Sequence, residues 1–289
     1  MPDPLNPSEV DSLISLLDDP DESIYKPVAA RLRKYGRPVM PALETAAAET
    51  DNALRKKRLQ RLTEDIHINS VIDDFTHWCE TGYFNIVEIL SIIARYESRN
   101  LAQRDIMEKL EILVYSLKQE ISIHATPLQQ IKAINHVLFT VHRFRPDISN
   151  AFNPKNNLID QVLERKTGSD IILGLIYMHV SKQLGFSIKP VNFPRNLLLA
   201  FGEEQNAGDI VFYINPFNKG AVLTKNDIRQ FLIQNKMPLK SSFFEPADMP
   251  AVIQRLLRYM TAAYTKTGEM QKVEDINQLL NILNSFFNL

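Results

Sequence analysis

The chain has 289 residues, of which 33 are Lys or Arg and 34 are Asp or Glu, so its formal net charge is −1. A nearly neutral chain lacks the basic excess that general binding to nucleic acid or to an anionic membrane needs. Only 9 residues are glycine, well under the usual share of roughly 7%, which argues against glycine-rich phosphate loops and favours helix. We expect a protein or small-ligand partner, with no nucleic acid and no membrane.

Cysteine usage and the first residues bear on location. A single cysteine, Cys79, cannot form an internal disulfide. The segment from Met1 to Pro4 lacks the basic and apolar regions of a signal peptide. The apolar stretch from Ile171 to Val180 is short of the roughly 20 residues that cross a bilayer. These features predict a cytoplasmic protein.

Short helices joined by polar turns are predicted over residues 1–65. Ser8 is a candidate cap for the first helix, and the acidic turn at 18–21 ends it. A second helix ends at Gly36, and prolines at 38 and 41 open a third. The second helix and its flanks resemble one α-solenoid unit of the HEAT kind. The basic run at 55–61 predicts a solvated helix face.

Further helices are predicted over residues 71–78, 86–96, 106–121 and 127–141. Thr126 followed by Pro127 is typical of a helix start, because a cap residue precedes a first-turn proline. The N-terminal half of the chain is therefore predicted to be helical.

A different pattern begins near residue 145, where a loop rich in Asn, Pro and Ser precedes a strongly apolar helix over Asp170–Leu184. Three short segments rich in β-branched and aromatic residues follow, at 188–193, 197–201 and 210–214. Two last helices, 252–264 and 270–286, meet at a turn that contains Gly268 and form a helical hairpin. The expected fold is α+β and predominantly helical, with a small antiparallel sheet.

Three segments carry a resemblance to a known family: Asn153–Phe201, Phe212–Leu232 and Arg255–Leu283. In this order they resemble the bacterial SirB-type branch of the transglutaminase-like superfamily. The resemblance covers roughly Phe75–Leu283. It implies a transglutaminase-like, cysteine-proteinase-like core of a helix and an antiparallel sheet, followed by a tetratricopeptide-like hairpin. The predicted domains are 66–245, the transglutaminase-like domain with a helical N-terminal part, and 246–289, the hairpin. Residues 1–65, the HEAT-like helical region, are an addition to the resemblance.

The resemblance also implies where catalytic residues would lie. The superfamily uses a thiolate at the start of the core helix, a histidine on the next strand and an aspartate on the strand after that. The nucleophile position falls at or within one residue of Asp170, the histidine position on Asn196 and the aspartate position on Asn215. None of these side chains is a thiol, and the amides of Asn196 and Asn215 take no proton at neutral pH, so the three cannot repeat the thiol chemistry. The expectation is a pseudoenzyme, without catalytic residues, metal or cofactor, that acts as a protein-binding or regulatory module.

Other polar residues match the family's pattern and form either local turns or a small cleft beside the former active site. The candidates for such a cleft are Asn153, Asn157, Glu164, Arg165, His179, Arg195, Phe217 and Asn218.

Two alternatives stay open beside the pseudoenzyme. One is a thiol-type or relocated-mechanism hydrolase or transferase that uses Asp170, His179 or Cys79. The other is a small-ligand binding module that uses the cleft at Asn196 and Asn215. The run His77-Trp78-Cys79 lacks the paired spacing of a zinc site, so we expect a packed helix face there.

Overall fold

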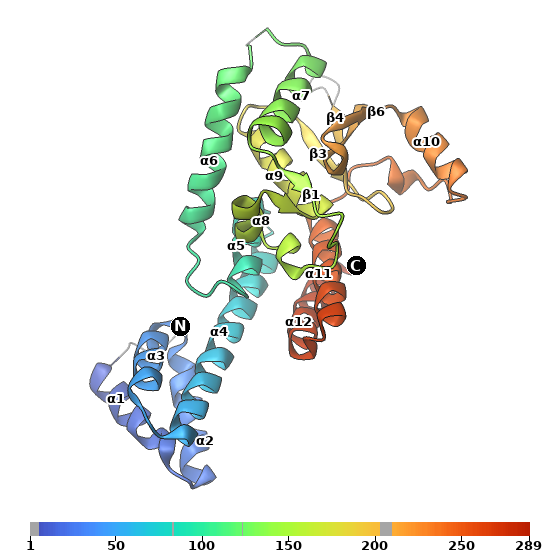
Figure 1. The fold of residues 1–289 in the computed structure, drawn as a ribbon. Coiled ribbons are helices and arrows are strands. Elements are labelled where there is room, and N and C mark those ends of the chain that lie inside the picture. The colour runs from blue at the N-terminus through green and yellow to red at the C-terminus, as the bar shows by residue number, and fades with distance from the viewer. Residues whose placement is uncertain (1–5, 83, 123, 203–209) are drawn as a thin grey trace. The chain divides into compact units, whose positions relative to one another are not determined.

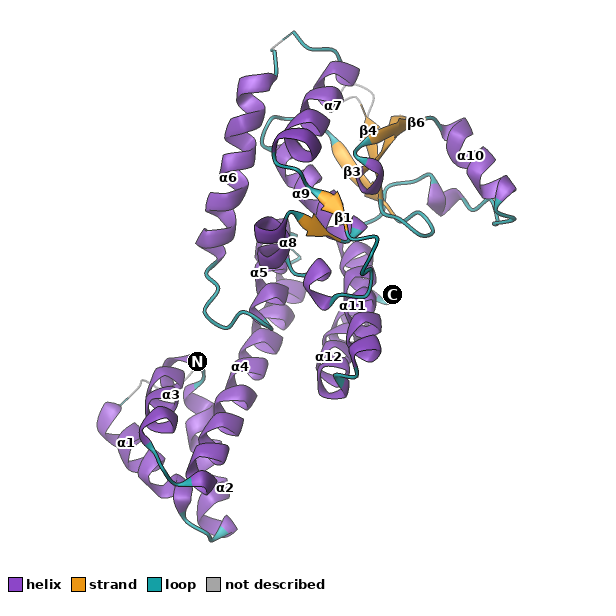
Figure 2. Cartoon of the chain, viewed as in Figure 1, coloured by secondary structure: helices purple, strands orange, loops and turns teal. Residues whose placement is uncertain are grey.

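The computed structural model describes residues 6–82, 84–122, 124–202 and 210–289 (Figures 1 and 2). The segment from Met1 to Pro4 lies outside the described residues. Two compact units are present: Met1–His77 with Arg95–Arg99, and Trp78–Ala94 with Asn100–Leu289. The predicted α+β fold, predominantly helical with a small antiparallel sheet, is confirmed. Figure 2 shows that the strands lie in the second unit.

The first unit is built from helices that surround a leucine-rich core. Its elements are α1 (Pro7–Ser15), η1 (Leu16–Asp18), α2 (Glu22–Tyr35), η2 (Arg37–Val39), α3 (Met40–Glu49) and most of α4 (Ala53–Thr81). Leu17, Leu32, Leu43 and Leu59 are fully buried in this core. Residue 65, the predicted domain boundary, lies inside α4, and the division between the compact units falls in the same helix after His77.

Local capping rules hold at some helix ends of this unit and fail at one. Gly36, with φ +65°, ends α2 as predicted, and the Asp21 side chain caps this helix by accepting from the Ser23 N–H at 2.8 Å. The prediction that Ser8 caps the first helix is wrong, because Asn6 precedes α1 and Ser8 lies within the helix. Ser8 contributes only its carbonyl, which accepts from the Ser12 hydroxyl at 2.8 Å.

Arg58 corrects the prediction of a solvated basic face on α4. Its guanidinium donates to the carbonyl oxygens of Leu17 and Asp19 at 3.1 and 2.5 Å, and to the Glu22 carboxylate at 2.9 Å. It also lies 4.1 Å from the centre of the Tyr25 ring. A helix end leaves carbonyls without intrahelical donors, and Arg58 supplies donors where the chain leaves η1.

The helices of the second unit include α5 (Ile86–Arg95, shared with the first unit at its last residue), α6 (Gln103–Glu120), α7 (Pro127–Asn135), α8 (Ile159–Arg165) and α9 (Asp170–Lys182). The predicted start of α7 is confirmed, because the Thr126 hydroxyl accepts from the Gln129 N–H and the Gln129 side chain accepts from the Thr126 N–H. The predicted helix continues as a π-type segment, η3 (His136–Val141). Every residue of α9 from Asp170 to Ser181 is buried.

The sheet has four antiparallel strands in the order β3 (Ile188–Val191), β4 (Leu198–Gly202), β5 (Ile210–Asn215) and β6 (Ala221–Leu223). The first three confirm the predicted segments. α9 packs against β3 and β4 (Figure 1). A short parallel pair, β1 (Arg145–Pro146) and β2 (Thr167–Gly168), also forms. Neither this pair nor β6 was among the predicted strands.

The chain continues from the sheet through α10 (Lys225–Gln234) and ends in α11 (Met249–Thr267) and α12 (Met270–Phe287). α11 and α12 pack against each other (Figure 1). Gly268, with φ +79°, forms the corner and confirms the predicted hairpin. α11 also contacts η4 (Pro154–Asn157), so the hairpin is part of the second unit.

Candidate functional site

The N-terminal end of α9 is the centre of the candidate site. The Ser169 hydroxyl accepts from the Ile172 N–H and caps the helix. Asp170 is the first residue of the helix, and its Oδ2 accepts from the Leu197 N–H at 2.5 Å. The Asp170 side chain is buried, and this burial raises the pKa of its carboxyl, against the opposing effects of Arg255 and the Leu197 N–H.

The bond from Leu197 to Asp170 joins two of the positions that the family resemblance singles out. Leu197 directly follows Asn196, and both Asp170 and Asn196 line one cavity. The third position, Asn215, lies at the end of β5, where its Oδ1 accepts from the Asn218 N–H at 3.2 Å and caps η5 (Pro216–Asn218). Asn215 does not line the cavity, but η5 packs on α9 and contributes Phe217 to the cavity wall.

Arg255 of α11 holds this arrangement together. Its Nη1 donates to the Phe193 carbonyl at 2.7 Å, and its Nη2 donates to the Tyr259 hydroxyl at 2.9 Å and lies 3.4 Å from Asp170 Oδ2. The Tyr259 hydroxyl in turn donates to the Arg195 carbonyl at 3.3 Å. Arg255 and Tyr259 were not among the predicted site residues, although their spacing of four residues on one helix face is a signal in the sequence.

The cavity has a volume of about 420 Å³ and a predominantly apolar wall. Five predicted residues line it: Asn157, Asp170, Arg195, Asn196 and Phe217. The rest of the lining is Asp147, Ile148, Ala151, Phe152, Asn156, Gly168, Ser169, Tyr259 and Ala262. The structure thus places residues from the loop after β1, from η4, from the start of α9, from the β3–β4 loop and from α11 around one hollow.

The other predicted cleft residues lie outside the lining. Asn153 caps η4 by accepting from the Lys155 N–H, and Glu164 and Asn218 are exposed. Arg165 positions two lining residues, because it donates to Asn156 Oδ1 at 3.2 Å and to Asp147 Oδ2 at 3.4 Å. His179 is buried in α9, and this burial lowers its pKa.

Two neighbouring asparagines of η4 differ in their hydrogen bonds. Asn156 accepts from Arg165 and donates to the Asn150 carbonyl at 2.9 Å. Asn157 is 2% exposed, and within the described part of the chain its Oδ1 accepts no hydrogen bond. A buried acceptor without a donor is uncommon in proteins, and within the described residues the Asn192 Oδ1 and the Tyr35 hydroxyl also lack a hydrogen-bond partner.

Cys79 lies outside the cavity lining. It is buried near the end of α4, and this burial together with the Glu80 charge raises the pKa of its thiol to about 12. A thiol with this pKa stays protonated at neutral pH and is a poor nucleophile. His77 is exposed, and no group of three or more His, Cys, Asp or Glu side chains suited to a metal ion occurs in the described residues.

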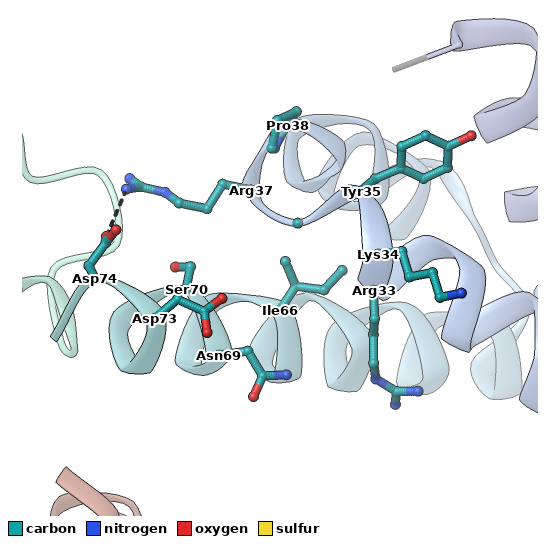
Figure 3. A pocket seen from close by; sticks show the side chains of 11 residues that line it. Arg33, Lys34, Tyr35, Arg37, Pro38, Ile66, Asn69, Ser70, Asp73 and Asp74 are labelled. Atoms are coloured by element: carbon teal, nitrogen blue, oxygen red, sulfur yellow. Dashed lines mark ion pairs between the residues drawn. The ribbon is translucent and has the colours of Figure 1, made fainter. Parts of the chain in front are cut away.

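A second hollow, of about 660 Å³, lies in the first unit between the end of α2 and α4 (Figure 3). Figure 3 shows Arg37 facing Asp74 across one end of it, at 3.8 Å. Asp74 also pairs with Arg95 at 2.8 Å, and Arg33 pairs with Asp65 at 2.6 Å. The wall of this hollow is more polar than that of the cavity at the start of α9, and it contains none of the predicted site residues.

A buried helix that begins at a cavity and packs on an antiparallel sheet agrees with the core that the family resemblance implies. The family model described as the transglutaminase-like superfamily matches residues 104–258, more than half of the chain, and the chain belongs to this superfamily. No solved structure matches. Among the helices of the described residues, none is long and apolar enough to span a membrane.

Curated relatives come from bacteria and animals. The chain is 29% identical to the UPF0162 protein YchA of Escherichia coli K12, over 60% of this chain and 64% of that protein. It is 31% identical to a UPF0162 protein of Vibrio cholerae over 42% of this chain and 44% of the relative. It is 30% identical to the mouse F-box only protein 21 over 53% of this chain. The match spans only 25% of the length of this mouse protein.

Proposed function

We propose that the chain is a non-catalytic transglutaminase-like protein, and that the cavity at the start of α9 binds a partner protein. The observation that carries the proposal is the set of side chains at the three positions implied by the family resemblance: an aspartate and two asparagines, Asp170, Asn196 and Asn215. None of the three is a thiol, and neither asparagine can replace the imidazole base or the carboxylate that orients it.

The contacts of these residues support the same conclusion. The Asp170 carboxylate is engaged by the Leu197 N–H and lies beside Arg255, and the Asn215 amide oxygen is engaged by the Asn218 N–H. Both groups therefore stabilise the fold around the cavity. The hydrolase or transferase alternative names Asp170, His179 and Cys79. The buried Cys79 thiol has a pKa of about 12, and neither it nor His179 lines the cavity; Asp170 does line it, with its carboxylate beside Arg255.

The finer assignment to the SirB-type branch belongs to this proposal. It rests on the order of the three resembling segments and on the hairpin of α11 and α12, which we propose to be tetratricopeptide-like. The hairpin takes part in the cavity through Tyr259 and Ala262, so a partner bound there would contact both the core and α11. We also propose a cytoplasmic location, because the single cysteine cannot form an internal disulfide of the kind common in secreted proteins.

The test compares partner retention by three forms of the chain in native host extract: wild type, Ala262→Trp and Lys266→Trp. Ala262 lines the cavity, so a tryptophan there fills it, whereas exposed Lys266, four residues further along α11, is the matched control. We expect wild type and Lys266→Trp to retain the same specific protein and Ala262→Trp to lose it. Equal retention by all three would contradict the proposal.

Catalysis is tested separately with the purified protein. A glutamine-containing peptide with a labelled amine, and an activated ester, are offered as acyl donors. We expect no reaction above the rate without protein. A rate that disappears in Asp170→Asn or Cys79→Ser would favour the hydrolase or transferase alternative.

A further inference from the structure

Arg195 lines the cavity at the start of α9 and brings a charge that nothing there balances. The lining also contains two carboxylates, and each has an arginine beside it: Asp147 lies 3.4 Å from Arg165, and Asp170 lies 3.4 Å from Arg255. Arg195 is exposed, and within the described residues its guanidinium makes no ion pair, hydrogen bond or ring contact. Because the charges of the two pairs cancel, the cavity keeps one uncompensated positive charge.

The backbone at Arg195 does not favour an arginine. Its φ is +76°, in the left-handed region that glycine adopts freely and that strains a residue with a Cβ. Six non-glycine residues of the described chain have such a φ, and Arg195 is the one among them that lines the cavity. The position is tied to the fold by its main chain, because the Arg195 carbonyl accepts from the Tyr259 hydroxyl. Glycine would keep this bond, so the arginine side chain points to a bound group.

The wall around Arg195 is mainly apolar and partly uncovered. Ile148 and Phe152, from the loop after β1, are 77% and 52% exposed, and Phe217 and Ala262 add apolar surface from η5 and α11. The volume of about 420 Å³ falls within the range of binding pockets. A partner that places an apolar side chain in the cavity removes this surface from water.

The single uncompensated charge matches a carboxylate. A guanidinium presents parallel N–H donors that fit the two carboxylate oxygens. A carboxylate carries one negative charge and balances Arg195, whereas a phosphate monoester carries nearly two. A cationic group would be repelled by Arg195 and would compete with Arg165 and Arg255 for their carboxylates.

We propose that the cavity recognises an acidic, apolar segment of the partner protein. A large apolar side chain of this segment enters the cavity, and an aspartate or glutamate next to it in the partner's sequence pairs with Arg195. The apolar wall then supplies general affinity, and Arg195 determines specificity. This inference rests on the proposed function, because it names the chemistry of the partner that the cavity binds.

The variants that test the role of Arg195 are Arg195→Gly and its matched control Arg143→Gly. Arg143 is also an exposed arginine with a left-handed backbone, φ +58°, but it lies outside the cavity lining. Glycine relieves the backbone but gives more freedom to the unfolded chain, so we expect both variants to keep the urea midpoint of wild type. A midpoint that falls in Arg195→Gly and not in Arg143→Gly would show that the side chain stabilises the fold, and would overturn the proposal.

The partner's chemistry is tested by selecting a phage-displayed library of random heptapeptides on the full chain, immobilised as wild type, Arg195→Gly, Arg143→Gly or Ala262→Trp. We expect wild type and Arg143→Gly to enrich peptides with an aspartate or glutamate next to a large apolar residue. Arg195→Gly should enrich the apolar residue alone, and Ala262→Trp should enrich neither. No enriched motif on wild type, or the same acidic motif on Arg195→Gly, contradicts the proposal.

The charge contact is measured by fluorescence anisotropy with the most enriched peptide and a twin in which asparagine or glutamine replaces the acid. We expect wild type to bind the acidic peptide about tenfold more tightly, as a hydrogen bond between charged groups implies, and Arg195→Gly to bind both alike. Equal affinities for wild type would refute the role of Arg195. If the amide twin regains the lost affinity through a free C-terminal carboxylate, the partner's C-terminus is the source and the side-chain assignment is wrong.

The results also separate this inference from the proposed function. If Ala262→Trp loses the host protein that wild type retains, but no acidic motif is selected, the inference fails and the proposed binding function stands. If the acidic motif is selected while Ala262→Trp retains the host protein as well as wild type does, the proposed function fails and the pairing of Arg195 with a carboxylate stands.

Discussion

The two hollows of this protein differ in the polarity of their walls. In the larger one, in the first unit, charged side chains line the wall, and Asp74 pairs with both Arg37 and Arg95. The smaller one, at the start of α9, has a mainly apolar wall and contains Asp170 and Asn196, two of the positions that the family resemblance singles out. These two positions, and not the volume, therefore identify the candidate binding site.

Each unit contains an arginine with the same kinds of contact, and the two arginines stabilise different features. Arg58 and Arg255 each donate to a main-chain carbonyl, lie beside a carboxylate and approach a tyrosine ring, at 4.1 Å for Tyr25 and 5.4 Å for Tyr259. In the first unit, this arrangement closes the end of η1. In the second unit, it fixes one wall of a cavity.

The largest expected effect comes from Asp170→Ala. This change removes the acceptor for the Leu197 N–H and leaves the half-buried Arg255 without its buried anion. We expect the free energy of unfolding to fall by about 3–5 kcal/mol, as for other broken buried pairs. Urea unfolding followed by Trp78 fluorescence, which reports on the second unit, measures it. Asp170→Asn keeps an acceptor and is the milder control; an equal loss in both variants would show that the charge, and not the hydrogen bond, matters.

Arg58→Ala tests the corresponding arginine of the first unit. We expect a loss of about 2–3 kcal/mol, because charged hydrogen bonds to two carbonyls and to Glu22 disappear. Hydrogen exchange read by mass spectrometry should show faster exchange in α1–α3 and unchanged exchange in α9. The neighbouring Lys57 is exposed, and Lys57→Ala should stay within about 0.5 kcal/mol of wild type. Faster exchange in α9 would show that the two units do not respond separately.

Tyr259→Phe removes only a hydroxyl from the cavity wall. The hydrogen bonds from Arg255 and to the Arg195 carbonyl are lost, and the ring stays. We expect about 1 kcal/mol of destabilisation and little change in partner retention, because the apolar wall is kept. Urea unfolding and the retention assay in host extract give the two values; loss of the partner would mean that the hydroxyl itself contacts it.

The pH dependence of stability gives the smallest effect. Burial lowers the pKa of His179 in the folded state, so the unfolded chain binds the proton more readily. The stabilisation from neutral His179 is fully present above the unfolded pKa of about 6.5 and is lost as the pH falls through that value toward the lower folded pKa. We expect His179→Gln to reduce the fall in stability between pH 7.5 and 5.5, and an unchanged pH profile would contradict this role.

Features governed by neighbouring residues could be predicted from the sequence. Gly36 and Gly268 end helices with positive φ, and Thr126 with Gln129 forms a capping box, as local rules require. The core helix and three of the strands follow from apolar periodicity and β-branched composition. The family resemblance placed Asp170 and Asn196, which the structure brings to one cavity.

Features that depend on distant partners could not be predicted. The Asp170 carboxylate accepts from the Leu197 N–H, 27 positions further along the chain, and Ser169 caps the helix. Arg58 is buried by carbonyls that lie about 40 positions away, although Lys56 and Lys57 of the same basic run are exposed. Charge patterning alone cannot show which member of a basic run is enclosed by such partners.

The central claim, a transglutaminase-like cavity that binds a partner protein without reaction, is tested most directly by partner retention in native host extract, compared between wild type, Ala262→Trp and Lys266→Trp. The account predicts that wild type and Lys266→Trp retain the same protein with its mass unchanged, and that Ala262→Trp loses it. Equal retention by all three forms, or a covalent change in the retained protein that Asp170→Asn abolishes, would contradict it.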